Sequence, residues 1–81
     1  MPYFSYVLYS EKFNRFYKGH CEDLVERLNQ HNHGHTTSTK PYIPWKLVYY
    51  EEFENRTDAV KREKYLKTAA GRRFLKNKIS F

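Results

Sequence analysis

The chain has 81 residues, with eight Tyr, six Phe and one Trp, and its formal net charge is +6. This aromatic content predicts one folded domain, residues 1–81, with a small core, and excludes a disordered tail. A single cysteine, Cys21, excludes an internal disulfide, and no apolar run approaches the length of a membrane span. We therefore expect a reduced, cytoplasmic protein with no membrane partner.

The first half of the chain predicts a hairpin followed by a helix. Residues 3–9 and 15–20 are rich in aromatic and β-branched residues, and the polar turn 10–14 separates them. The acidic pair Glu22 and Asp23 suits the first turn of a helix, which is expected to end near Asn32, before Gly34.

The second half predicts a strand and two helices. A loop over 33–44 leads into a buried strand over 45–53, in which Trp45 is expected to pack in the core. Asn55 or Thr57 can cap the next helix, and Gly71 is expected to separate it from a terminal helix over 72–79. The order β-β-α-β-α-α predicts an α+β fold, a central three-stranded antiparallel sheet flanked by helices.

Glu63 occupies an unusual position on the predicted helix over 55–68. At helical spacing, the apolar face of this helix consists of Ala59, Val60, Leu66 and Ala70. Glu63 lies in the middle of that face, so its carboxylate must be paired, protonated or bound to a cation. A salt bridge to an arginine is the simplest explanation, and a metal ion is the alternative.

The earlier helix also carries polar groups beside its core face. Leu24 and Leu28 form the apolar stripe, and Arg27 and His31, one turn apart, flank it. Two explanations stay open at this point. Arg27 pairs with Glu63, or both helices present their polar groups to a shared concave site.

Positive charge is concentrated toward the end of the chain. Residues 59–81 contain eight Lys and Arg and one acid, a net charge of +7, whereas residues 1–58 contain seven basic and eight acidic residues, a net charge of −1. Such a distribution favours a surface for a polyanion such as nucleic acid over an ordinary solvated helix.

Two tyrosines of the hairpin belong to a recognisable pattern. Tyr6 and Tyr17 are expected to lie across from each other on adjacent strands. The segments Phe4-Ser5-Tyr6 and Tyr17-Lys18-Gly19 look like the two halves of the GIY-YIG endonuclease motif. With Arg27 eight residues after the glycine and Glu63 on the later helix, nearly the whole chain resembles this family. The likeness is strongest to its short, single-domain bacterial members and weaker to the nuclease domain of UvrC-type excision proteins.

The resemblance implies a role for each of these residues. Tyr17 would orient or deprotonate the attacking water, and Tyr6 would support it near the reacting phosphate. Arg27 would hold the scissile phosphate, and Glu63 would be the single metal-binding carboxylate. His31 falls where other members place a residue that helps in proton handling, so the choice between Tyr17 and His31 as general base stays open.

The motif differs from the family pattern at two places. Phe4-Ser5 replaces Gly-Ile, a change that hardly weakens the resemblance. Lys18 replaces the central isoleucine and adds a cation near the site unless its side chain turns to the opposite face. His20 stands where some members have a lysine. The basic residues expected to contact nucleic acid are Lys18, His20, Lys40, Lys61, Lys64, Lys67, Arg72, Arg73 and Lys76.

A site with one carboxylate suits Mg²⁺, with Mn²⁺ as the alternative ion, because Mg²⁺ keeps most of its waters and takes few protein ligands. One carboxylate argues against a two-metal scheme. The histidines and Cys21 include good zinc ligands, but they lack a paired-cysteine spacing. Hydroxyls over 36–39 either contact phosphates or belong to an ordinary loop.

The sequence therefore predicts a metal-dependent DNA endonuclease or nickase, with a role in repair or recombination. A non-catalytic nucleic-acid-binding module on the same scaffold is the alternative, and a scaffold that recruits repair proteins is a third. RNA as the partner, and a monomer or homodimer as the functional state, are both left open.

Overall fold

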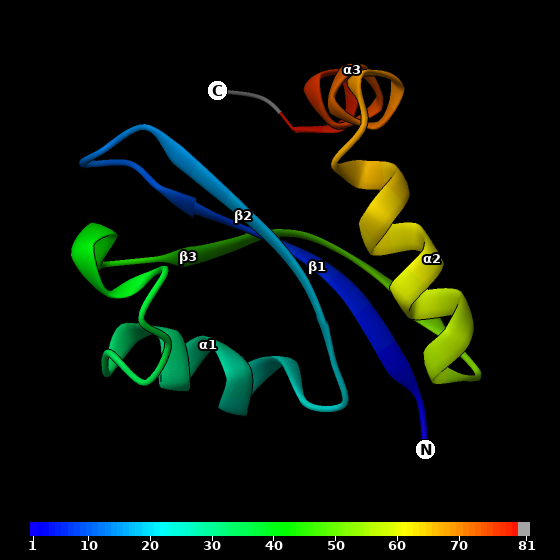
Figure 1. The fold of residues 1–81 in the computed structure, drawn as a ribbon, viewed down its shortest axis with the longest axis horizontal. Coiled ribbons are helices and arrows are strands. Elements are labelled where there is room, and N and C mark those ends of the chain that lie inside the picture. The colour runs from blue at the N-terminus through cyan, green and yellow to red at the C-terminus, as the bar shows by residue number, and fades with distance from the viewer. Residues whose placement is uncertain (80–81) are drawn as a thin grey trace.

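The computed structural model describes residues 1–79. Its helices and strands follow the predicted order (Figure 1): β1 Tyr3–Ser10, β2 Arg15–Cys21, α1 Leu24–Asn32, the 3-10 helix η1 Lys40–Tyr42, β3 Lys46–Phe53, α2 Arg56–Leu66 and α3 Ala69–Lys78. None of the helices in the described part of the chain is long and apolar enough to span a membrane.

The three strands form one antiparallel sheet in the order β2-β1-β3. β1 lies in the centre, so its residues are the most deeply buried of the sheet. Tyr6 pairs with Gly19, and Leu8 pairs with Tyr17. The two tyrosines are therefore diagonal neighbours, with ring centroids 6.3 Å apart, and the prediction that they lie across from each other is wrong by two residues.

Helices cover both faces of the sheet (Figure 1). On one face Tyr6, Leu8 and Trp45 form a core with apolar residues of α1. On the other face Val7 packs against Leu66 of α2 and residues of α3. The expected core position of Trp45 is confirmed. Because successive residues of a strand point to opposite faces, β1 and β3 contribute to both cores, whereas the core residues of β2 lie on the α1 face.

Side-chain caps set the beginning of each α-helix. Asp23 accepts from the backbone N–H of Glu26 at 3.0 Å, and Asn55 accepts from that of Asp58 at 2.9 Å. Asn55 is thus the cap of α2, and the alternative cap Thr57 lies inside the helix. Ser5 fixes α2 on the sheet by donating its hydroxyl proton to the carbonyl oxygen of Ala59 at 2.6 Å.

The break between α2 and α3 differs from the prediction. Gly71 lies inside α3, and the helices separate at Lys67 and Thr68, whose side chain caps α3. A Cβ on Gly71 would collide with the carbonyl oxygen of Tyr65, so the glycine permits close packing at this corner. Ala70 consequently follows the break and is exposed, and its placement on the core face of α2 was wrong.

Candidate active site

A cleft of about 630 Å³ opens at the edge of the sheet, beside β2. Tyr17 and His20 of β2, Arg27 of α1 and Glu63 of α2 all line it. Because α1 and α2 lie on opposite faces of the sheet, the cleft must wrap around the edge strand to include both. The structure thus brings three of the five predicted catalytic residues, Tyr17, Arg27 and Glu63, into one cleft.

The other two, Tyr6 and His31, are buried behind this cleft, each only 1% exposed. The Tyr6 hydroxyl lies 3.0 Å from His31 Nε2, and His31 Nδ1 lies 2.8 Å from Thr39 Oγ1. Thr39 donates its own proton to the carbonyl oxygen of Thr36 at 3.3 Å, so it must accept from Nδ1–H. His31 Nε2 is then the acceptor for Tyr6, which fixes the tautomer of the ring.

Burial keeps both members of this pair uncharged. It raises the pKa of Tyr6, an effect that the neighbouring Tyr17 increases. It lowers the pKa of His31, and the positive charge of Arg27 lowers that pKa further. The charge of Arg27 partly offsets this rise in the pKa of Tyr6, so the guanidinium that lines the cleft lies near the buried phenol.

Gly19 is required by the position of Tyr6. A Cβ at residue 19 would lie 2.6 Å from the Tyr6 hydroxyl oxygen and 2.7 Å from Cζ. Such distances are far below van der Waals contact, so only glycine lets β2 pass over the phenol. The glycine of the Tyr17-Lys18-Gly19 segment therefore has a packing reason that comes from the opposite strand.

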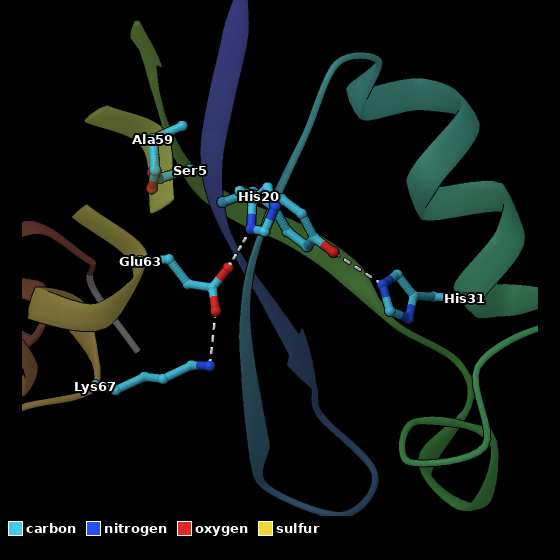
Figure 2. A network of polar contacts seen from close by, with 7 residues as sticks. Ser5, His20, His31, Ala59, Glu63 and Lys67 are labelled. Carbon is cyan, nitrogen blue, oxygen red and sulfur yellow. Dashed lines mark hydrogen bonds and ion pairs between the residues drawn. The ribbon is translucent and has the colours of Figure 1, made fainter. Parts of the chain in front are cut away.

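Glu63 lies between a histidine and a lysine (Figure 2). Its Oε1 is 2.6 Å from His20 Nδ1, and its Oε2 is 2.7 Å from Lys67 Nζ. The Glu63 side chain is 15% exposed and that of Lys67 is 54% exposed. Burial alone would raise the pKa of Glu63, but the hydrogen bonds and charges of Lys67 and His20 outweigh it and lower the pKa. Within residues 1–79 the partners of Glu63 are these two residues, not Arg27, so the simplest pairing expected from sequence is wrong.

Comparison with known proteins agrees with this geometry. The family model for the GIY-YIG catalytic domain matches residues 2–78. The chain belongs to the GIY-YIG family. A UPF0213 protein of Staphylococcus saprophyticus is 36% identical over 66 residues, which cover 80% of each chain. A UPF0213 protein of Listeria innocua is 35% identical over 80 residues, 98% of this chain and 83% of the relative.

A solved structure supports the same fold. The solution NMR structure of a UPF0213 protein of Bacillus halodurans aligns with a TM-score of 0.54 and 23% identity, over 93% of this chain and 82% of that one. Family membership and fold together make this chain a nuclease-like GIY-YIG scaffold of the short bacterial type.

The GIY-YIG site suits a metal ion held by one carboxylate. Glu63 is ionised and faces a polar cleft, and Lys67 is exposed enough to leave Oε2 without unfolding any element. This fits Mg²⁺, which takes one or two carboxylates plus waters and phosphate oxygens. Among residues 1–79 no three His, Cys, Asp or Glu side chains gather in a way that could hold a metal, so the zinc alternative finds no cluster there.

The basic residues predicted to contact nucleic acid fall in several places. His20 lines the GIY-YIG cleft. Lys18 lines a different hollow with Arg72 and Lys76, so its side chain is turned away from Tyr17.

The remaining cations of that set are spread over the surface. Lys61, Lys64 and Arg73 are exposed on α2 and α3. Lys40 belongs to η1, which lies with α1 on the other side of the sheet (Figure 1). The set therefore does not form one continuous surface.

Two features of the site were missed from sequence. Thr39 is 1% exposed and holds His31, whereas its hydroxyl-rich loop suggested phosphate contacts or an ordinary loop. Arg56 and three acids, Glu22, Asp23 and Glu26, also line the cleft. The only local signal for Asp23 was its position at the start of a helix. That position accounts for its role as a cap and does not predict that it lines the cleft.

Proposed function

We propose that this GIY-YIG domain hydrolyses phosphodiester bonds of DNA with the help of a divalent metal ion, as an endonuclease or nickase. The observation that supports this proposal is the single cleft lined by Tyr17, Arg27 and Glu63 in front of the buried Tyr6–His31 pair. A phenol, a guanidinium and a carboxylate converge there from three separate elements, which is the set of groups that phosphodiester hydrolysis needs.

Arg27 is proposed to bind the scissile phosphate. A guanidinium makes bidentate, charge-assisted contacts to phosphate oxygens and stabilises the charge that develops on them. The Tyr6–His31–Thr39 network lies behind Arg27 and is closed to solvent. Arg27 thus stands beside a rigid, buried network, and the phosphate would be its charged partner in the cleft.

The geometry favours Tyr17 over His31 as the group that contacts the attacking water. His31 is buried, and both of its ring nitrogens already have partners within hydrogen-bonding distance. Tyr17 lines the cleft itself. His31 therefore acts through Tyr6 as a positioning residue, and Tyr17 orients the water or accepts its proton.

Glu63 is proposed to hold the Mg²⁺ or Mn²⁺ ion, which when bound supplies charge neutralisation at the phosphate and an acidified water. His20 donates to Glu63 and fixes the orientation of the carboxylate. Lys67 neutralises the same carboxylate from the solvent side.

One observation favours a second candidate, a nucleic-acid-binding module without turnover. Both oxygens of Glu63 already have nitrogen partners, at 2.6 and 2.7 Å, and a triad of this kind satisfies the carboxylate without any metal. In that case the cleft binds phosphates through Arg27 and does not cut.

Nicking of supercoiled plasmid separates the two candidates. The nuclease proposal expects nicked product with Mg²⁺ and none with EDTA, and expects Glu63→Gln to bind DNA but to lose cutting. Glu52→Gln, the same change on exposed β3, is expected to cut normally. If wild type and Glu63→Gln bind DNA equally and neither cuts plasmid, flap or branched DNA, the binding module is the better account.

A further inference from the structure

A second hollow lies against the other face of β2. It encloses about 330 Å³ and is lined by Phe16, Lys18, Arg72, Leu75, Lys76 and Ile79. Three apolar side chains and three cations thus line this hollow, which is called the α3 groove. Its volume lies at the lower end of the roughly 300–1,000 Å³ typical of sites for small molecules.

The α3 groove and the cleft differ in charge. Among the described residues that line the groove none is acidic, whereas four carboxylates line the cleft. Burial lowers the pKa of Lys18, and the charges of Arg72 and Lys67 lower it further, so these cations lie close together. Such a group of cations among apolar side chains is complementary to a ligand with an anionic backbone and a flat apolar part.

The groove also lies next to the cleft along β2. Lys18 and His20 lie two residues apart on the same face of β2, which places them roughly 7 Å apart along the strand. Lys67 influences Lys18 and at the same time pairs with Glu63 in the cleft. A polyanion bound at Arg27 and Glu63 would therefore continue toward the groove.

We propose that the α3 groove binds an unpaired nucleotide of the strand whose phosphate occupies the cleft. The base would lie on Phe16 and Ile79, and the flanking phosphates on Lys18, Arg72 and Lys76. Grooves that bind single strands combine cations along the backbone with aromatic side chains on which bases stack, and Phe16, 43% exposed, is the aromatic residue in this lining. A base inside a duplex stays stacked on its neighbours and does not enter.

This inference rests on the proposed function and makes it more specific. The substrate class would be DNA with a single-stranded segment beside the bond that is cut, such as an overhang or a flap. The cleft would supply the chemistry, and the groove would supply the preference for unpaired structure.

Fluorescence anisotropy in EDTA, where no cutting occurs, tests the preference with three DNAs. They are a blunt duplex, the same duplex with a short overhang, and that duplex with an abasic overhang, which keeps the phosphates and lacks the bases. We expect the normal overhang to bind about 10-fold more tightly than the blunt duplex, and the abasic overhang to lose most of that gain. Equal affinity for all three DNAs, or full gain with the abasic overhang, would overturn the proposal.

Variants locate the effect in the groove. We expect Ile79→Ser to remove the difference between normal and abasic overhangs, and Lys76→Ala to reduce the overhang preference several-fold. Lys78→Ala makes the same change two residues along α3, outside the groove lining, and should keep the preference. Because Ile79 also packs in the core of this face, thermal unfolding of Ile79→Ser must be measured. If Ile79→Ser is unfolded, the comparison of Lys76→Ala with Lys78→Ala tests the proposal instead. An overhang preference that survives Lys76→Ala would contradict binding in the groove.

Two further results have defined meanings. Overhang preference without any Mg²⁺-dependent nicking would refute the proposed nuclease and leave the groove in place. Nicking without overhang preference would refute the groove alone. Binding of phosphatidylglycerol vesicles that Lys76→Ala abolishes, with DNA binding unchanged, would assign the groove to lipid and overturn the proposal.

Discussion

At the scale of single residues, Gly19 connects strand pairing to the shape of the cleft. Its backbone lies over the Tyr6 phenol, which in turn holds His31 and lies near Arg27. An alanine at this position must displace either the strand or the ring. Gly19 is therefore needed because it leaves room for the Tyr6 ring near Arg27, and not because it makes the strand flexible.

We expect Gly19→Ala to lower the free energy of unfolding by about 1–3 kcal/mol, as other overpacked sites do. In a domain of this size each kcal/mol lowers the melting temperature by roughly 4–8 °C. In a Tyr6→Phe background the nearest atom is gone, so the same change should cost less. A double-mutant cycle by urea unfolding measures this coupling, and strictly additive costs would contradict the contact.

His31 makes stability depend on pH. Its pKa in the folded protein lies below the ordinary 6.5, because of burial and then of Arg27. Below about pH 6.5 the unfolded chain binds a proton that the folded protein does not, so stability decreases as pH falls from 6.5 toward the folded pKa, by up to about 1.4 kcal/mol per pH unit.

Urea unfolding between about pH 5.5 and 7.5, one unit either side of the ordinary histidine pKa, measures this effect. We expect His31→Gln to flatten the decrease and His35→Gln, an exposed histidine of the same region, to leave it unchanged. An identical slope in wild type and His31→Gln would rule out His31 as its source.

At the scale of elements, most of the fold was predictable from local patterns. Aromatic and β-branched runs predicted the three strands, and the acidic pair Glu22 and Asp23 and the cap Asn55 marked two helix starts to within a residue or two, although Asp23 caps α1 from outside its first turn. Gly71 was misread because a glycine in a helical pattern usually signals an end. Here the stronger signal was Thr68, whose hydroxyl caps α3 while Gly71 serves close packing.

The cap assignment has a direct test. Thr68→Ala removes the acceptor for the Gly71 N–H and should destabilise the protein by about 1 kcal/mol. Thr57→Ala, the same substitution inside the first turn of α2, should change stability by less than about 0.5 kcal/mol. Differential scanning calorimetry of both variants checks this, and equal losses would mean that Thr68 does not cap α3.

At the scale of the whole molecule, the site needed information that no local pattern contains. The resemblance to GIY-YIG nucleases predicted the set Tyr17, Arg27 and Glu63, which the structure places in one cleft. It did not predict that Glu63 pairs with His20, 43 positions away, because that contact depends on how α2 packs over β2. Periodicity likewise placed His31 beside the core face, but its burial depends on Tyr6 and Thr39.

The basic end of the chain predicts strongly salt-dependent DNA binding. If about six phosphates are engaged, a plot of log affinity against log salt should have a slope near −5. Replacing Arg72, Arg73 and Lys76 together by alanine should make the slope shallower by about 2 to 3 units, whereas Lys12→Ala on the hairpin turn should not. Anisotropy titrations across a salt series give both slopes, and an unchanged slope in the triple variant would remove α3 from the interface.

The most direct test of the central claim is the rate at which purified protein nicks supercoiled plasmid with Mg²⁺. Tyr17→Phe, Arg27→Ala and Glu63→Gln change one group from each of the three elements that form the cleft. The account predicts that each lowers the wild-type rate by at least about 100-fold while the melting temperature stays close to that of wild type. A wild-type protein that cuts neither plasmid nor flap nor branched DNA, or a variant among these three that nicks at the wild-type rate, would contradict it.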